Sequence, residues 1–163
     1  MNPCPCGFNG YETEKRSCTC SGSQIEKYQQ KLSGPIYDRL DLHIDVPLIS
    51  FHELVQSPAS DNSSYSTKEM QKRIRNGLEF IKYTGRTNPN GLLQPKEIKK
   101  YCQLTKPAEE LLHMAYNELH FSARGYHKIL KIARTIADLN QQEEIDERVI
   151  AEAIQYRSLD RKM

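Results

Sequence analysis

Four cysteines near the N-terminus stand in two Cys-x-Cys pairs, Cys4 with Cys6 and Cys18 with Cys20, which bracket 11 residues. Their thiolates would supply four soft ligands, a set that suits tetrahedral zinc. Because four protein ligands leave no position open for a substrate, such a site would be structural. The alternatives are four reduced thiols in an unordered loop, or oxidised cysteine pairs in an aged sample. We favour zinc, because a segment this rich in Gly, Pro, Ser and Asn would not become ordered without a metal.

A second candidate is the acid–base pair Asp38-Arg39, which lies between the break Ser33-Gly34-Pro35 and the alternating segment Leu42–Val46. Alternation of apolar and polar residues is typical of a half-buried strand. The pair would then lie at the mouth of a sheet, where α/β proteins place their ligands. The simpler interpretation is a surface ion pair of little energetic value. The alternative is an arginine held rigidly to meet a phosphate.

Arg124 is a third candidate, because it follows Ser122, a residue that can cap a helix. A cation in the first helical turn opposes the helix dipole, and Gly125 weakens the helix further. Two locally unfavourable residues side by side indicate an anion site at a helix N-terminus, with an arginine added. Three more basic residues would continue along the same side of this helix: Lys128, Lys131 and Arg134. The usual alternative for such a stripe is a solvated face.

The composition limits the class of protein that carries these residues. Of 163 residues, 37% are hydrophobic and 27% charged, with a mean hydropathy of −0.72, which fits a helical protein with large solvated faces. The net charge of +2 is too small to indicate nucleic acid or an anionic membrane by itself. No apolar run approaches the roughly 20 residues of a membrane span, and no signal-peptide pattern is present. The chain has five cysteines, and an odd number without a secretory signal argues against a disulfide framework. A reducing, cytoplasmic compartment is therefore favoured.

Apolar residues recur at helical spacing in a short segment over 24–32 and throughout the chain from Ser66 onward. Residues 56–65 are a linker by composition. The predicted fold is therefore mainly α, ending in an all-helical bundle over 66–163. Cap residues or a proline in the first turn predict where its helices begin: Ser66, Pro95, Pro107, Ser122 and Asp146.

Five stretches of the chain carry a family resemblance through their order and spacing. They are MNPCPCG at 1–7, Cys18-Thr19-Cys20, LSGPIYDRLDLHIDVP at 32–47, FSARGYHKILKIARTIADL at 121–139, and residues 145–157. With these stretches the chain resembles the magnesium-chelatase-like AAA+ ATPases, and within them the ComM/YifB branch, over nearly its whole length. The cysteine insert favours that branch over the true chelatase subunits, whose equivalent loop lacks these cysteines.

The resemblance implies roles for four residues. Asn2 corresponds to sensor 1, which polarises the attacking water or reads the γ-phosphate. Arg39 corresponds to the arginine finger that reaches the nucleotide of the neighbouring subunit, with Asp38 orienting it. Arg124 corresponds to the sensor 2 arginine of the lid, which contacts the nucleotide of its own subunit. Tyr37 replaces the expected leucine and puts nothing catalytic in doubt.

The resemblance also implies a domain organisation. Residues 1–55 would be the C-terminal piece of an AAA+ α/β core, with the cysteine loop, a short helix and one strand. Residues 56–65 would be a linker, and 66–163 the helical lid. The family's Walker A and Walker B motifs lie upstream of sensor 1, and no phosphate-binding Gly-x-x-x-x-Gly-Lys-Ser/Thr motif occurs here. We expect the intact protein to be an ATPase that uses ATP and Mg²⁺, and this chain alone to be inactive.

The partners implied by the resemblance are the chain's own upstream ATPase core, neighbouring subunits of a homo-hexamer, and DNA. The implied activity is helicase or branch migration during DNA uptake and recombination, and no membrane is involved. One alternative is the ATPase subunit of a magnesium chelatase. Another is a free-standing, zinc-stapled helical module that binds a protein or nucleic acid through the basic stripe.

Overall fold

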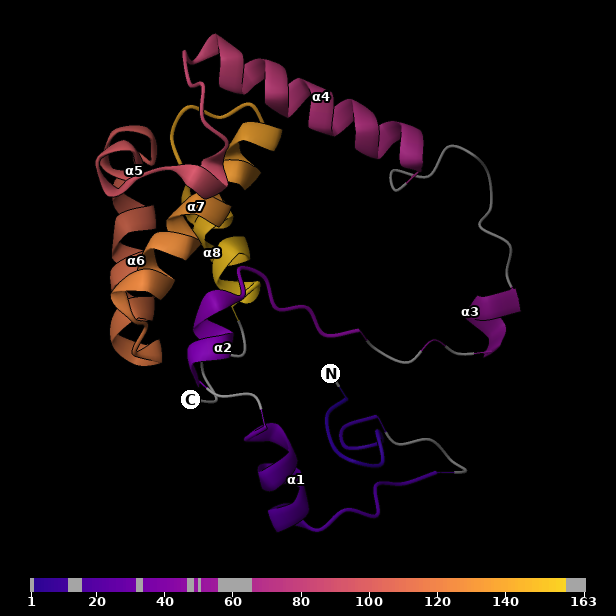
Figure 1. The fold of residues 1–163 in the computed structure, drawn as a ribbon. Coiled ribbons are helices and arrows are strands. Elements are labelled where there is room, and N and C mark those ends of the chain that lie inside the picture. Colours follow the sequence, from indigo (N-terminus) through magenta and orange to yellow (C-terminus); the bar gives the residue numbers. More distant parts are fainter. Residues whose placement is uncertain are drawn as a thin grey trace. The chain divides into compact units, whose positions relative to one another are not determined.

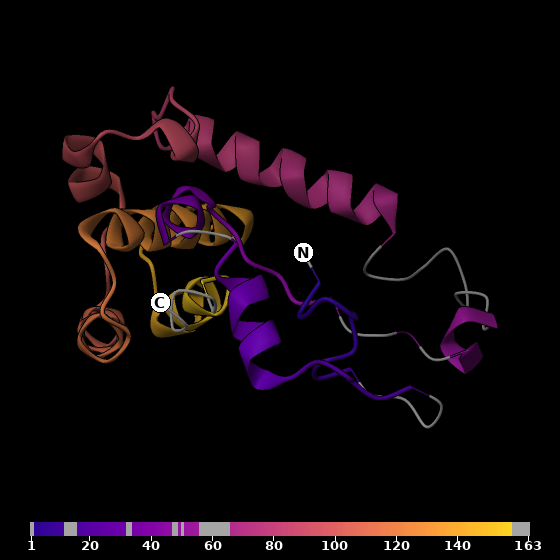
Figure 2. The ribbon, with the colours of Figure 1, turned by 60° about the horizontal axis from the view of Figure 1, so that its bottom comes forward.

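A computed structural model describes residues 2–11, 16–31, 34–46, 49, 51–55 and 66–157. The predicted linker 56–65 lies outside these described residues, as do Met1, Leu32, Ser33 and Pro47 from the matching stretches. The described chain is mainly α, as predicted (Figures 1 and 2). It forms two compact units: Met1–Arg39 with Asp45–Ser57, and Leu40–Ile44 with Pro58–Met163.

The first unit contains the cysteine loop and short helices. A capping box begins its first helix, because the Ser21 hydroxyl accepts from the Gln24 amide at 3.3 Å and the Gln24 side chain accepts from the Ser21 amide at 3.0 Å. The Gln29 side chain at the other end of this helix donates to the Pro3 carbonyl at 3.3 Å. The described helices of this unit are α1 (Gly22–Gln29), α2 (Gly34–Arg39) and α3 (Phe51–Val55).

The second unit is a helical bundle, and its helices begin where the sequence predicts. Side chains cap three of them: Ser66 accepts from Glu69 N, Ser122 from Gly125 N and Asp146 from Val149 N. Pro95 and Pro107 each lie in the first turn of a helix, as predicted. The described helices are α4 (Thr67–Tyr83), the 3₁₀ turn η1 (Asn90–Leu92), α5 (Pro95–Tyr101), α6 (Lys106–Leu119), α7 (Ala123–Leu139) and α8 (Glu147–Gln155).

Helix α7 is central to this bundle, since it packs against α4, α5 and α8, while α6 packs against α8 (Figure 1). Gly77 of α4 permits the close approach to α7, because a Cβ there would lie 3.0 Å from Leu139 Cδ2. The N-terminal half of α4 extends beyond α7 (Figures 1 and 2), so its apolar residues Met70 and Ile74 are about half exposed. None of the described helices has the length and apolar character needed to cross a bilayer.

The segment Leu42–Val46, predicted as a half-buried strand, is not a strand, and the prediction is wrong. The expected orientation is also reversed: His43 is 6% exposed, whereas Leu42 is 51% and Ile44 67% exposed. A strand requires a ladder of hydrogen bonds to a neighbouring strand. Here the His43 amide instead donates to the Tyr156 carbonyl, just after α8, at 2.7 Å. Alternation predicted an extended shape but carried no information about its partner.

Candidate functional site

The four N-terminal cysteines come together in the first unit, with all four Sγ atoms within 4.8 Å of one another. Cys4 Sγ lies 3.3 Å from Cys6 Sγ and 3.8 Å from Cys18 Sγ. These separations are far longer than a disulfide bond of about 2.05 Å, and the thiols are free. Around a tetrahedral zinc with bonds of about 2.3 Å, sulfur atoms would be about 3.8 Å apart. The cluster therefore has the dimensions of a tetrahedral thiolate site.

The backbone of the cysteine loop directs amide groups at the sulfurs. Gly7 turns the chain with a φ of 86°, and its amide donates to the Cys4 carbonyl at 3.1 Å. The Asn9 amide donates to Cys4 Sγ at 3.4 Å. Burial alone would raise the pKa of Cys4, but hydrogen bonds led by the Asn9 amide lower it overall. These donors favour a thiolate, the form that binds a metal.

The pKa is lowered for two of the four thiols, Cys4 and Cys6, and raised for the other two, Cys18 and Cys20. Hydrogen bonds from the Phe8 amide and from Cys4 lower the pKa of Cys6 to about 6. A backbone hydrogen bond at Cys20 lowers the pKa of Cys18, but burial and the neighbouring thiols outweigh it and raise that pKa to about 12. The pKa of Cys20 is raised too, where burial and the neighbouring thiols outweigh a hydrogen bond from the Cys6 backbone. Four thiolates this close repel one another, so a cation is needed to ionise all four together.

Asn2, the candidate sensor residue, is exposed and lies two residues before Cys4. Its side chain borders the turn of the cysteine loop, since a Cβ built on Gly7 would lie 3.8 Å from Asn2 Nδ2. The position of Asn2 is therefore tied to the order of that loop.

Asp38 and Arg39 occupy the last turn of α2. The sequence predicted a Gly-Pro turn leading into a strand, but Gly34 and Pro35 instead begin this short helix, where proline is well tolerated. Arg39 is exposed and Asp38 is half-buried. Both residues belong to the first unit, and Arg39 directly precedes Leu40 of the second.

Arg124 lies exposed in the first turn of α7, at the predicted place. The Ser122 hydroxyl accepts from the Gly125 amide at 3.0 Å. No acidic residue is present in this first turn to offset the positive end of the helix dipole. The arrangement combines backbone donors, the dipole and a guanidinium, and can therefore hold an anion such as a phosphate. Arg124 belongs to the second unit.

Two of the three residues of the predicted basic stripe are buried, so the stripe does not form a continuous exposed surface, and its alternative interpretation as a solvated face does not hold for them either. Lys128 is 9% exposed and Arg134 2% exposed. Lys128 pairs with Asp41 at 2.9 Å, and Arg134 pairs with Asp138 at 3.0 Å. Helical spacing predicted a shared side but could not identify the carboxylates and carbonyls that bury these cations.

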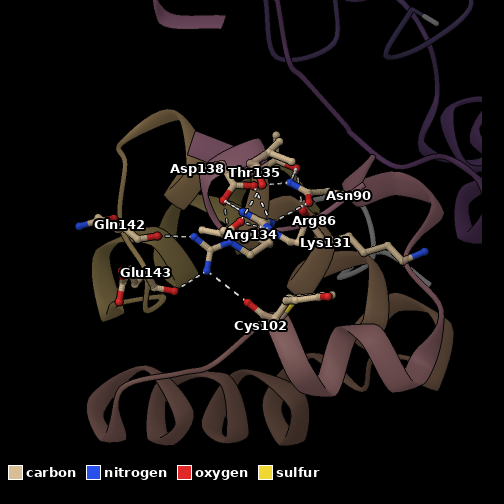
Figure 3. A network of polar contacts seen from close by, with 12 residues as sticks. Arg86, Asn90, Cys102, Lys131, Arg134, Thr135, Asp138, Gln142 and Glu143 are labelled. Atoms are coloured by element: carbon tan, nitrogen blue, oxygen red, sulfur yellow. Dashed lines mark hydrogen bonds and ion pairs between the residues drawn. The ribbon is translucent and has the colours of Figure 1, made fainter. Parts of the chain in front are cut away.

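A buried polar network on α7, which the sequence analysis missed, surrounds Asp138 (Figure 3). Its carboxylate accepts from Arg86 Nη1 at 2.9 Å, from Asn90 Nδ2 at 2.6 Å and from Arg134 Nε at 3.0 Å. Arg134 also donates to backbone carbonyls, including that of Glu143 at 2.6 Å. The spacing of Arg134 and Asp138, four residues apart on one helix, was the available signal. The network stabilises the bundle and is separate from Arg124.

Comparison with known protein families shows to which family the chain belongs. Residues 64–157 match the family model described as magnesium chelatase, subunit ChlI C-terminal, and residues 1–54 match the model described as magnesium chelatase, subunit ChlI. The chain belongs to the magnesium chelatase ChlI family. The predicted resemblance is thereby confirmed.

Sequence alignments with curated proteins cover nearly the whole chain. It is 37% identical over 160 residues to a protein named competence protein ComM from Haemophilus influenzae. It is 35% identical over 161 residues to a protein named YifB from Salmonella typhimurium, and 32% identical to its namesake from Escherichia coli. These alignments cover 98–99% of this chain but 30% of each relative. The chain thus spans less than a third of the length of these relatives.

Proposed function

We propose that this chain forms the sensor and lid region of an ATP-dependent AAA+ motor of the ComM type. In this proposal residues 1–55 complete an ATPase core, 56–65 link the two parts, and 66–163 form the lid. The single observation that carries the proposal is the exposed Arg124 in the first turn of α7, in a chain that belongs to the magnesium chelatase family. Phosphoryl transfer depends mainly on positioned cations, so an arginine at this place suits a nucleotide sensor.

The proposed roles divide between the two units. Arg124 contacts the phosphates of the nucleotide bound by its own subunit, and the positive end of α7 adds to that attraction. Arg39, exposed at the end of α2, reaches the nucleotide of the neighbouring subunit, and Asp38 orients it. Asn2 holds the attacking water or the γ-phosphate. ATP and Mg²⁺ bind through motifs that the 163 residues do not contain, so the chain alone does not hydrolyse ATP.

We also infer that Cys4, Cys6, Cys18 and Cys20 hold a structural zinc ion. The inference rests on the sulfur spacing, which fits a tetrahedron, and on amide groups directed at the sulfurs. Zinc bound there would neutralise the crowded thiolates and order the loop. Because Asn2 borders this loop, the zinc would also hold the proposed sensor in place.

The proposed motor works as a homo-hexamer on DNA. A ring of identical subunits is consistent with the role proposed for Arg39, because a finger acting on a neighbour uses the same interface at every step of the ring, and six subunits is the number that the resemblance implies. Similarity to a protein named for competence supports a DNA substrate, as does the resemblance to the ComM branch. We propose helicase or branch-migration activity during DNA uptake or recombination.

The magnesium chelatase ATPase subunit is a second candidate, because both matching family models are named for it. The cysteine cluster favours the ComM branch over this alternative. The third candidate, a zinc-stapled binding module, required the basic stripe as its surface. Burial of Lys128 and Arg134 removes that surface and disfavours the module.

The proposal is tested by Arg124→Ala in the full-length motor. We expect ATP turnover to fall roughly 100-fold or more, a typical loss for a donor aimed at transition-state charge. Arg148→Ala is the matched control, because Arg148 occupies the corresponding second position of α8, but there beside the acidic Asp146 and Glu147. Turnover should be unchanged in the control. Unchanged turnover in Arg124→Ala, with weaker, salt-dependent binding of a partner, would instead support a binding module.

A further inference from the structure

Two buried cations hold the segment Leu40–Ile44, here called the strap, on the bundle. Lys128 Nζ of α7 donates to the Leu40 carbonyl at 3.0 Å and pairs with Asp41 Oδ1 at 2.9 Å. The Arg157 guanidinium, just after α8, donates to the same Leu40 carbonyl and to the Asp41 carbonyl at 3.4 Å. The backbone of the strap is thus attached to the second turn of α7 and to the residue that lies two positions after α8.

Burial indicates which of these contacts stabilise the strap. Asp41 is 75% exposed on its side chain, so its ion pair with Lys128 contributes little. Lys128 is 9% exposed and Arg157 1% exposed, and a buried cation is costly unless carbonyls or carboxylates surround it. Both cations satisfy part of that need with the Leu40 carbonyl. His43, 6% exposed, and its amide bond to Tyr156 complete the attachment.

The strap is adjacent in sequence to Arg39 and is bound to the helix that carries Arg124, the two arginines of the proposed nucleotide sites. Arg39 is linked to Leu40 by a single peptide bond. Arg124 precedes Lys128 by four residues, about one turn, on α7. The backbone next to the proposed finger is therefore bound to the helix that carries the proposed sensor.

We propose that Lys128 and Arg157 are positioning residues for Arg39. By fixing the strap they hold the backbone from which Arg39 extends, so a movement of α7 as Arg124 engages its own nucleotide is passed to the finger on the neighbouring site. Neither residue touches the nucleotide. The inference rests on the proposed function, since it assigns a role relative to Arg39 and Arg124.

The test is Lys128→Met in the full-length motor, with kcat and KM for ATP measured separately. We expect kcat to fall roughly 10- to 100-fold, because a finger displaced by about 1 Å loses that much, while KM changes little. Lys128→Arg, which keeps a cation and its donors, should restore most of the rate. Lys131→Met is the matched control, because Lys131 lies on the same helix and donates to the Gly91 carbonyl at 2.9 Å, outside the strap. Its kcat should be unchanged.

A double-mutant cycle with Arg39→Ala separates positioning from general destabilisation. If Lys128 acts through Arg39, Lys128→Met should lower turnover no further in the Arg39→Ala background. An equal further loss in that background, or an unchanged kcat in the single variant, would overturn the inference while leaving the proposed function intact. A wild-type motor without ATP turnover would overturn the proposed function and the positioning role with it. In this chain itself, Lys128→Met should speed hydrogen exchange of the His43 amide, and unchanged protection would also contradict the attachment of the strap by Lys128.

Discussion

Arg86 and Asp138 form an ion pair in which both side chains are 2% exposed. Arg134, also buried, shares the same carboxylate from the preceding turn of α7. The loop after α4 is thereby fixed to the C-terminal half of α7 by one acid between two cations (Figure 3). Such a network holds the helical bundle in one arrangement only while every member is present.

Replacing Asp138 with Asn should strongly destabilise the chain. The substitution leaves two buried guanidinium groups without their carboxylate, and breaking a buried pair lowers the free energy of unfolding by about 3–5 kcal/mol. Urea denaturation followed by circular dichroism measures this change. Lys72→Met is the control, because Lys72 pairs with Glu69 on the exposed face of α4, and we expect a loss below about 0.5 kcal/mol. A comparably small loss for Asp138→Asn would contradict the account.

The freshly reduced chain should contain one zinc ion, measurable by elemental analysis. Chelation should disorder the cysteine loop, whereas the helices of the second unit should persist, because their apolar core contains none of the four ligands. Cys18→Ser should lose the metal. Cys102→Ser should keep it, since Cys102 is buried in the bundle, where its thiol faces the Leu130 carbonyl. Zinc well below one per chain in wild type would count against the site.

Zinc binding should release protons in a number that the cysteine pKa values limit. Cys6, with a pKa of about 6, is mostly thiolate at pH 7.5, whereas Cys18, with a pKa of about 12, is still protonated. Cys20 is raised as well and Cys4 lowered. We therefore expect release of roughly two to three protons per zinc, measurable by calorimetry in buffers of different ionisation enthalpy. By linkage, zinc affinity should therefore fall by roughly two to three powers of ten for each unit that the pH is lowered near pH 7.5, and more steeply below pH 6, where Cys6 is protonated as well. A flat profile would contradict the assignment.

His120→Gly should stabilise the second unit. His120 ends α6 in the left-handed conformation, with a φ of 50°. Glycine adopts this conformation without the steric cost of a Cβ, so a gain of about 0.5–1 kcal/mol and a higher Tm are expected. His113→Gly, an exposed position inside α6, is the contrasting control and should destabilise by about 1 kcal/mol. A loss of stability in His120→Gly would show that the imidazole itself is needed there.

The features predicted well from the sequence were those decided by neighbouring residues. The starts of α4, α7 and α8 depend on a side chain that caps an amide three residues later, and such a signal is complete within four residues. The clustering of Cys4, Cys6, Cys18 and Cys20 was likewise predicted from their spacing within a short segment.

The failures involve partners that lie far away in the sequence. The carbonyl that Lys128 binds belongs to Leu40, 88 residues earlier, so helical spacing alone placed Lys128 in a basic stripe and did not show that it is buried. For the same reason, the alternation in Leu42–Val46 gave an extended segment but not the bundle surface on which His43 is buried. Arg134 was placed in the basic stripe that continues from Arg124, although its carboxylate partner is only four residues away, because spacing carries no information on burial.

The central claim is that Arg124 acts on the nucleotide of its own subunit and Arg39 on that of the neighbour. Mixing two inactive full-length variants, Arg39→Ala and Arg124→Ala, tests it most directly. An Arg39→Ala subunit keeps its own sensor and can receive a finger from an Arg124→Ala neighbour. Random mixing in a ring should therefore restore about a quarter of the sites, and ATP turnover should rise well above that of either variant.

The control for this mixture replaces the Arg124→Ala subunit with one that carries both substitutions, which can donate no finger. That mixture should stay inactive. Turnover in the Arg39→Ala and Arg124→Ala mixture that remains at the level of the separate variants would contradict the assignment of the two arginines to different subunits' sites.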